Sequence, residues 1–242
     1  MTLNIVLSGY GRMGKETEKA ALAKGHRVVA TPDSLADWQL MADAIATADV
    51  VIDFSLPDAA GGNAERALAL GKPFVTGTTG WKPDYDHIRH LIARHGGAFL
   101  LASNFSVGVN ILFYVQKQMA GLLADAGGYR AVIEETHHIH KKDAPSGTAI
   151  RLANDLVATM PPLQRWENNP STDREVLPVI SYRQGEVPGT HVTTFTSAND
   201  VLTLKHEALG RGALAAGAVL AAEWIAQRQG VFTFEEVLGL SR

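Results

Sequence analysis

The stretch Leu3–Gly14, LNIVLSGYGRMG, decides the fold class of this chain. Its first six residues are an apolar run typical of a buried strand, and a glycine-rich turn leads from them directly into an amphipathic segment. In such a turn Gly9 permits a tight bend, Gly11 lets a pyrophosphate approach the backbone, and Gly14 lets helix and strand pack closely. The new helix also offers free N–H groups and a positive dipole end to a phosphate. The strand–turn–helix context therefore predicts a dinucleotide cradle, and it disfavours the alternative of a glycine-rich turn without a ligand.

The next hundred residues follow the same rhythm of short apolar runs and amphipathic stretches, which is typical of βαβ units. We expect strands at residues 3–8, 26–31, 48–55, 73–79 and 98–103, and helices at residues 12–25, 58–71 and 84–96. Crossover connections between parallel strands are almost always right-handed. This part of the sequence therefore predicts an α/β fold, a Rossmann-like doubly wound parallel sheet.

The pattern changes after Asn104, where a long helix at residues 107–126 is followed mainly by strands with alternating apolar and polar residues. Such alternation predicts a second, α+β domain built on an open sheet with one covered face. We expect strands at residues 130–135, 175–183, 190–197 and 200–208, a polar loop at residues 160–175, and a final helix at residues 212–230. The predicted domains are 1–104 plus 208–242 for the dinucleotide, and 105–207 for substrate binding and oligomerisation.

The helix after Ser146 is amphipathic, with apolar residues at a period near 3.6 that would cover one face. Its other face could pair with a second copy of the chain, so we expect an oligomer. The composition excludes several other partners. The 242 residues carry a net charge of −3 and contain no cysteine, so nucleic acid, an acidic membrane, disulfides and thiolate metal sites are not expected. No segment is apolar for long enough to span a bilayer, and the N-terminus lacks a cleavable leader, so we expect a cytoplasmic protein.

Asp33 lies 19 residues beyond Gly14, at the end of the second expected strand. An acidic residue at this place commonly binds the ribose hydroxyls of the adenosine. There is no Arg or Lys between Val28 and Trp38. A 2′-phosphate would therefore meet negative charge without a counter-charge, which predicts NADH over NADPH, although NADPH remains possible. If Asp33 is only a loop acid, this preference loses its basis.

The third and fourth expected strands end in residues suited to a nicotinamide ring. Phe54 and Ser55 end the third strand, and the corner Gly77–Gly80, GTTG, ends the fourth. Open α/β sheets bind ligands at the carboxyl ends of their strands. The corner alone would predict only a turn, so this interpretation depends on the cradle.

A second candidate site lies in Glu134–Ile150, EETHHIHKKDAPSGTAI. If the chain before Lys141 is extended, His137 lies on one face and His138 and His140 lie on the other. That alternation splits the three histidines, so a metal site is not expected. A purely structural alternative pairs the histidines with neighbouring glutamates at a strand edge.

The functional interpretation is a carboxylate clamp with a proton donor beside it. Ser146 or Thr148 could cap the following helix, and the first N–H groups of that helix would accept a carboxylate. Lys141 adds a mobile positive charge, and a histidine can titrate near neutral pH and act as a general acid. This arrangement suits a small dicarboxylate substrate.

The stretch Glu135–Thr148 resembles the signature of dihydrodipicolinate reductases, the bacterial and plant enzymes of the diaminopimelate route to lysine. The resemblance extends over most of the chain, through the segments SGYGRMG, VIDFS, GTTG, SNFSVGVN, GEVPGTH and KHEALGRGALAAGA. It implies a Rossmann-like domain, a mixed-sheet domain for substrate binding and tetramerisation, and a homotetramer. It also implies that NAD(P)H reduces the cyclic imine formed from 4-hydroxy-tetrahydrodipicolinate to tetrahydrodipicolinate.

Carried over to this sequence, the resemblance implies that His137 is the proton donor and Lys141 the second catalytic residue. The residues expected to hold the carboxylates are His138, Lys141, Ser146, Gly147 and Thr148. The residues expected to bind the cofactor are Gly9, Gly11, Arg12, Met13, Gly14, Asp33, Phe54, Ser55, Gly77, Thr78, Thr79, Ala102 and Phe105. The chain lacks some thirty residues of the longer members, mostly between the second and third strands, and it has Ser34 where many relatives carry an arginine. Both departures concern the adenosine pocket, and Ser34 agrees with the expected NADH preference.

Two other functions share parts of this pattern. An amino-acid dehydrogenase of similar layout, such as an aspartate dehydrogenase, would share the cradle but would not need the HHIHKKDAPSGT stretch. A regulator that senses NADH without catalysis would keep the fold but would have little use for a proton donor beside a carboxylate clamp.

Overall fold

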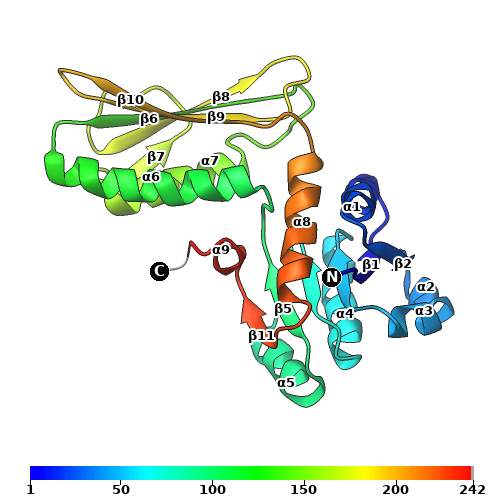
Figure 1. Ribbon diagram of the computed structural model, residues 1–242. Helices are drawn as coiled ribbons and strands as arrows, with labels where there is room; N and C mark the ends of the chain where they lie inside the picture. Colours follow the sequence, from blue (N-terminus) through cyan, green and yellow to red (C-terminus); the bar gives the residue numbers. More distant parts are fainter. Residues whose placement is uncertain (241–242) are drawn as a thin grey trace. The chain divides into compact units, whose positions relative to one another are not determined.

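The computed structural model describes residues 1–240, which form two compact units (Figure 1). Unit 1 consists of Met1–Val107 together with the chain from Arg211 onward, and unit 2 is Gly108–Gly210. The chain passes from unit 1 to unit 2 after residue 107 and returns after residue 210. Each of these boundaries lies three residues after the one expected from the sequence, 104 and 207.

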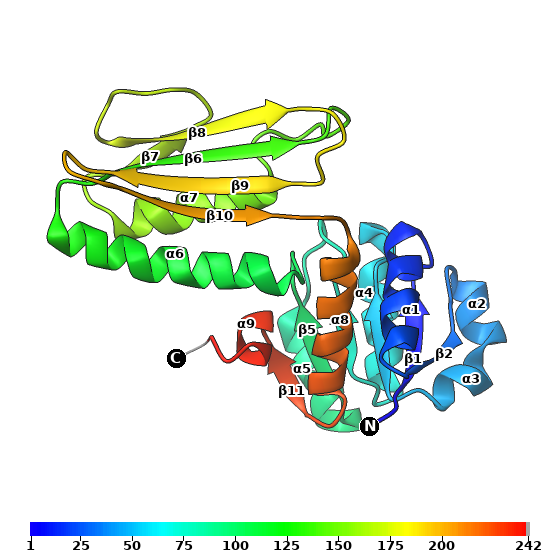
Figure 2. The same cartoon turned by 45° about the horizontal axis from the view of Figure 1, so that its top comes forward.

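Unit 1 is built on a six-stranded parallel sheet with the strand order β11-β5-β4-β3-β1-β2 (Figure 2). Its strands are β1 (Asn4–Ser8), β2 (Arg27–Ala30), β3 (Val50–Asp53), β4 (Phe74–Thr76), β5 (Ala98–Leu101) and β11 (Gly230–Phe232). Its helices are α1 (Arg12–Ala23), α2 (Leu35–Leu40), α3 (Ala42–Ala46), α4 (Pro57–Ala69), α5 (Tyr85–His95), α8 (Gly212–Ile225) and α9 (Phe234–Val237). The prediction of a Rossmann-like parallel sheet is confirmed.

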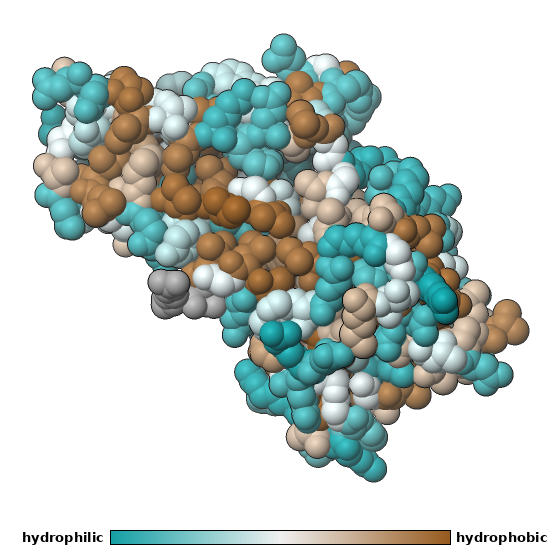
Figure 3. Space-filling view, in the orientation of Figure 1, coloured by the Kyte–Doolittle hydropathy of each residue, from teal (hydrophilic) through white to brown (hydrophobic). Residues whose placement is uncertain are grey.

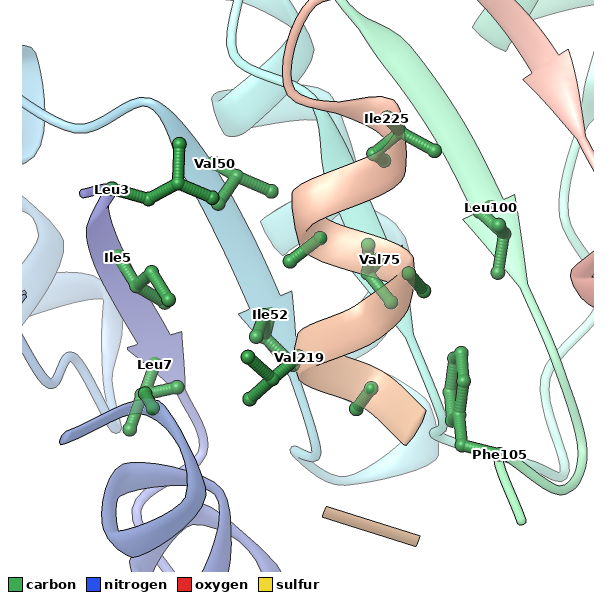
Figure 4. Close-up of a cluster of buried hydrophobic side chains, with 14 of the residues drawn as sticks. Leu3, Ile5, Leu7, Val50, Ile52, Val75, Leu100, Phe105, Val219 and Ile225 are labelled. Atoms are coloured by element: carbon green, nitrogen blue, oxygen red, sulfur yellow. The ribbon is translucent and has the colours of Figure 1, made fainter. Parts of the chain in front are cut away.

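Both faces of this sheet are covered by helices. Successive residues of each strand point to opposite sides, so each strand contributes to two separate clusters. On one face, Ile5 and Ile52 pack with Val219 of α8 (Figure 4). On the other face, Val6 belongs to a separate buried cluster with Leu68 of α4. This two-sided burial explains why the strands of unit 1 are almost wholly apolar.

Helix α8 lies so close to the backbone at Phe105 that one of its glycines has no room for a side chain. A Cβ atom at Gly217 would lie 1.8 Å from the carbonyl oxygen of Phe105. We therefore expect Gly217→Ala to lower the free energy of unfolding by about 1–3 kcal/mol, the usual cost of overpacking. Urea unfolding measures this. Gly212→Ala in the same helix is the matched control, since a Cβ there meets nothing within 4 Å. Equal stability of the two variants would contradict the prediction.

Unit 2 contains a five-stranded sheet with the order β10-β9-β6-β8-β7. Its strands are β6 (Arg130–His137), β7 (Arg165–Glu167), β8 (Val176–Arg183), β9 (Thr190–Thr196) and β10 (Val201–Glu207), and its helices are α6 (Val107–Ala126) and α7 (Gly147–Thr159). Strand β6 pairs parallel with β8 and antiparallel with β9, so the sheet is mixed, as expected. The expected loop at residues 160–175 is wrong in part, because β7 forms within it and pairs parallel with β8.

Helices α6 and α7 contribute to one buried cluster with the inner face of this sheet, through residues such as Phe113, Leu152 and Ile133. Helix α6 also has an apolar outer face, on which Ile111 and Leu122 are exposed. Figure 3 shows hydrophobic side chains gathered where α6 lies. Within residues 1–240, none of the helices has both the length and the apolar character to cross a membrane.

Candidate active site

The glycine turn after β1 has the geometry that its sequence predicts. Gly9 has φ +83°, and a Cβ atom on it would lie 2.6 Å from the Phe54 carbonyl carbon. A Cβ atom on Gly14 would lie 2.4 Å from the Gly9 carbonyl oxygen. Gly11 has open space around it and is the N-cap of α1, which no side chain caps within the described part of the chain. The turn therefore offers the uncapped first amides of α1, including those of Arg12 and Met13 in its first turn, to an anion.

Asp33 lies beside this turn, where a ribose-binding acid is expected. One oxygen of its carboxylate, Oδ1, accepts a hydrogen bond from the Tyr10 amide at 2.5 Å. A second carboxylate is close by, because Asp37 accepts hydrogen bonds from the Asp33 and Ser34 amides. The Ser34 hydroxyl and the Asp33 amide lower the pKa of Asp37, which keeps this acid ionised at neutral pH. The rim is therefore negatively charged.

The residues expected near the nicotinamide are held together at the ends of β3 and β4. The Phe54 ring contacts the Phe105 ring edge-on with centroids 6.2 Å apart, and a Cβ atom on Gly77 would lie 2.2 Å from the Phe54 ring. The amide of Ala102 donates to the Thr76 carbonyl at 3.1 Å. Ser55 accepts a hydrogen bond from the Asn63 side chain, while Thr79 is exposed.

The residue that organises this corner was not predicted from the sequence. Asp53, at the end of β3, is fully buried and accepts hydrogen bonds from Asn63, Thr76 and Thr78. The hydroxyl of Thr78 is therefore committed to the protein at 2.8 Å, and its role is to anchor the loop. A carboxyl group at the end of an otherwise apolar strand was the available signal, because a buried polar group must be hydrogen-bonded.

In unit 2, the expected alternation of the histidines is wrong beyond His137. Strand β6 ends at His137, and residues 138–141 form a turn in which the Lys141 amide donates to the His138 carbonyl at 3.1 Å. Strand β8 ends at Arg183, the partner of His137 in the ladder, and beyond it the Ile139 amide donates to the Gly185 carbonyl at 3.1 Å. The rings of His138 and His140 lie 6.0 Å apart by their centroids.

The start of α7 has the predicted cap. Ser146 is the N-cap, and its hydroxyl accepts a hydrogen bond from the Ala149 amide at 3.2 Å. Its own amide is not free, because it donates to Glu135 at 3.0 Å. The amides of Gly147 and Thr148 have no acceptor within residues 1–240. These two amides are therefore the ones available to a carboxylate.

The positive charge expected beside this helix end is also present. The Lys141 ammonium group lies 2.8 Å from the Asp143 carboxylate, and its side chain is 23% exposed. The pair lies on the turn between β6 and α7. An anionic ligand would therefore compete with Asp143 for Lys141, which remains accessible enough to exchange partners.

Sheet register builds a buried polar cluster that the sequence analysis did not foresee. Glu135 on β6 lies opposite His191 on β9, and His137 lies opposite Arg183 on β8. One Glu135 oxygen, Oε2, is 3.3 Å from His137 Nδ1 and 3.7 Å from His191 Nε2. The other oxygen, Oε1, is 3.2 Å from Arg183 Nη2. The alternation of HVTTFT does place His191 on the covered face, and this was the missed signal.

The cluster has a defined charge state at neutral pH. Burial would raise the pKa of Glu135, but polar contacts with His137, Ser146 and Ser181 outweigh it and hold this pKa well below its usual range. Burial, with a smaller contribution from the charge of His137, lowers the pKa of His191 to about 4. Glu135 is therefore an anion and His191 is neutral.

Glu135, His137 and His191 form the group of side chains within residues 1–240 whose spacing would also suit a metal ion, with candidate atoms within 4.8 Å of one another. The Arg183 guanidinium and the Ser146 amide already neutralise one oxygen of Glu135, and His191 Nε2 lies 3.1 Å from the Ser146 hydroxyl. These are the contacts of a buried ion-pair network, and we interpret the cluster as one. The absence of a metal remains a prediction, which the metal content after purification without chelator would test.

The low pKa of His191 predicts a pH dependence of stability. Between its folded pKa of about 4 and an unfolded pKa of about 6.5, only the unfolded chain binds this proton. The free energy of unfolding should therefore fall as the pH decreases through this range, by up to about 3 kcal/mol from this group. His191→Gln lacks this titrating group, so its free energy of unfolding should fall less than that of wild type as the pH decreases. Any stability deficit of the variant, measured by urea unfolding, should therefore shrink towards pH 4. His90→Gln, at an exposed histidine, is the control and should keep the wild-type slope. A constant deficit for His191→Gln would contradict the prediction.

Together, a dinucleotide cradle in one unit and a cationic, histidine-bearing helix end in the other define a two-domain oxidoreductase that uses a pyridine nucleotide. Residues 3–105 match the family described as "Dihydrodipicolinate reductase, N-terminus", and residues 108–238 match "Dihydrodipicolinate reductase, C-terminus". The chain belongs to the dihydrodipicolinate reductase family.

Similar proteins match this chain over nearly its whole length. The 4-hydroxy-tetrahydrodipicolinate reductase of Christiangramia forsetii is 39% identical, over 98% of both chains. The protein of the same name from Rickettsia bellii is 36% identical, over 95% of this chain and 91% of its own. A solved structure, the dipicolinate-bound dihydrodipicolinate reductase from Paenisporosarcina sp. TG-14, has a TM-score of 0.76 at 19% identity, over 98% of this chain and 99% of its own. That structure supports the fold.

Proposed function

We propose that this protein reduces the cyclic imine derived from 4-hydroxy-tetrahydrodipicolinate to tetrahydrodipicolinate, a step in the diaminopimelate route to lysine. The observation that carries the proposal is the start of α7, where two free amides, those of Gly147 and Thr148, accompany Lys141 and His137. Family membership supports the reaction. The name of the Paenisporosarcina structure, which includes bound dipicolinate, supports a small dicarboxylate ligand.

In this proposal unit 2 binds the twice-negative substrate and supplies the proton. The Gly147 and Thr148 amides hold one carboxylate, together with the Ser146 cap that fixes their orientation. Lys141 exchanges Asp143 for the other carboxylate, and His138 lies on the same turn as a further donor. NAD(P)H, when bound, supplies the hydride. His137 donates its proton to the ring as the hydride is added, so no full negative charge has to form on the reduced ring.

Unit 1 binds the dinucleotide. The turn of Gly9, Gly11 and Gly14, with the first amides of α1, would hold the pyrophosphate. Phe54, Ser55 and the Gly77–Thr79 loop would hold the nicotinamide, with Ala102 and Phe105 beside them. The residues fit this group because Gly11 has open space around it and no described side chain caps the first amides of α1.

We expect NADH to be preferred over NADPH, with a kcat/KM at least about tenfold higher, the effect of roughly 1.4 kcal/mol. The reason is the pair of carboxylates at Asp33 and Asp37, which would repel a 2′-phosphate. The double change Asp33→Ser and Ser34→Arg should shift the ratio towards NADPH. Initial rates with each cofactor over a range of concentrations measure it. A wild-type enzyme with the higher kcat/KM for NADPH would contradict the charge argument.

A homotetramer and a cytoplasmic location belong to the same proposal. The apolar outer face of α6, with Ile111 and Leu122 exposed, gives a reason for self-association. The outer face of the sheet in unit 2 is a further surface for self-association. It carries Val132 and Val192, which alternate with buried neighbours along β6 and β9. Light scattering after size exclusion should give about four times the chain mass of 25.9 kDa. A mass of one or two chains would contradict the proposed tetramer.

A coupled assay tests the proposed reaction most simply. The condensation product of pyruvate and aspartate semialdehyde is supplied with NADH, and the absorbance of NADH should fall at a rate proportional to enzyme. Oxidation of aspartate by NAD⁺ would favour an amino-acid dehydrogenase instead. Binding of NADH without turnover of any imine would favour a regulator.

A further inference from the structure

We propose that Glu135 is the positioning residue of this reaction: its carboxylate holds the Nδ1 side of His137, so that Nε2 is the atom that carries the transferred proton. The inference rests on the proposed role of His137, and it adds a residue that the signature stretch alone does not single out. It concerns contacts made wholly within unit 2.

The geometry places Glu135 where it can act only through its neighbours. Its side chain is 0% exposed and that of His137 is 9% exposed, and the Oε2–Nδ1 distance is 3.3 Å. Both residues lie on the covered face of β6, two positions apart. Glu135 therefore has no access to a ligand, but it contacts Nδ1 of His137.

The Nε2 side of the ring is kept clear by a glycine. A Cβ atom at Gly189 would lie 3.0 Å from His137 Nε2, and the φ angle of +157° at Gly189 suits glycine. A side chain at this position would press on the nitrogen that must reach the substrate. The ring thus faces a charge on its Nδ1 side, and on its Nε2 side it lies beside a residue without a side chain.

Glu135 is itself fixed, which a positioning residue must be. Its Oε1 accepts the Ser146 amide at 3.0 Å and lies 3.2 Å from the Arg183 guanidinium. Arg183 also donates to the carbonyl oxygens of Asp143 and Lys141, at 2.5 and 3.3 Å. One carboxylate therefore links the proton donor, the start of α7 and the turn that carries Lys141.

The other charged and titratable groups around His137 are either neutral or paired with other residues. His191, from β9, stays neutral at physiological pH because burial lowers its pKa to about 4. His206 on β10 is the ladder partner of His191, and burial lowers its pKa as well. Arg183 from β8 and Lys141 from the turn carry positive charges paired with Glu135 and Asp143. Glu135 is the anion in contact with His137, and its Oε2 faces the Nδ1 atom of the ring.

A purely structural role is the main alternative, in which Glu135 only anchors Arg183 and the start of α7. Glu135→Gln separates the two roles, since the amide keeps a carbonyl acceptor for Ser146 and Arg183 but loses the charge that faces His137. Glu134→Gln is the matched control. Glu134 is the preceding residue of the same strand, points to the opposite face, and accepts a hydrogen bond from Tyr182 at 3.1 Å.

We expect Glu135→Gln to lower kcat by about 10–10²-fold, as the loss of a histidine-orienting partner commonly does, with KM for NADH unchanged. Glu134→Gln should match wild type in both constants. A kcat of Glu135→Gln equal to that of wild type would overturn the inference.

A second measurement needs neither substrate nor turnover, so it separates this inference from the proposed function. In wild-type protein with ¹⁵N-labelled histidine, NMR should show neutral His137 protonated at Nδ1, the nitrogen that faces Glu135. In Glu135→Gln this tautomer preference should weaken. The Nε2-protonated tautomer in wild type would overturn the inference even if Glu135→Gln does not fold. Failure of the coupled assay would remove the proposed reaction but leave this result standing.

Discussion

His137→Ala is expected to lower kcat by about 10²–10⁴-fold, the usual loss when a general acid is removed. The Michaelis constants for NADH and for the imine should change little, because the clamp of Lys141 and the first amides of α7 remains. Steady-state rates in the coupled assay measure both constants.

The matched control is His140→Ala, three residues further along. His140 lies on the turn of residues 138–141. Its side chain is 69% exposed and lies 3.3 Å from the Glu186 carboxylate. An exposed pair of this kind contributes little, so the control should keep wild-type kcat. If His137→Ala turned over at a near-normal rate, the proton would have another source and His137 would lose its assigned role.

Lys141→Ala should damage turnover and binding together, with a loss in kcat/KM of about 10²–10³-fold. The ammonium group holds a carboxylate in the ground state, which affects KM. It also offsets the charge that builds up as the ring accepts a hydride, which affects kcat. Initial rates over a range of imine concentrations separate the two effects.

The neighbouring Lys142 provides the control for this change. Lys142 is exposed, and Lys142→Ala alters the net charge by the same amount as Lys141→Ala. Long-range attraction of an anionic substrate would weaken equally in both variants, whereas a direct contact is lost only with Lys141. Equal losses in the two variants would rule out the specific clamp.

Local patterns in the sequence were sufficient to predict the fold. The glycine turn after β1 requires Gly9 and Gly14 for reasons of space that operate within a few residues. The missed elements are short. Strand β11 has three residues, too few for a visible period. Helix α2 has six, although its capping box of Ser34 and Asp37 was a usable signal.

The candidate site was predictable where it depends on neighbours in the sequence, and not where it depends on strand register. The Ser146 cap and the proximity of Lys141 follow from a continuous stretch. The contacts of Glu135 with His191 and Arg183 join residues 56 and 48 positions away in the sequence, brought together by the pairing of β6 with β9 and β8. Periodicity shows which face of a strand is covered but not which strand lies beside it.

The most direct test of the account is a crystal structure of the protein with NADH and pyridine-2,6-dicarboxylate, a planar dianion that cannot be reduced in place of the imine. The account predicts one carboxylate on the Gly147 and Thr148 amides and the other on the Lys141 ammonium group, displaced from Asp143. A ring bound in unit 2 away from both Lys141 and the start of α7 would contradict it.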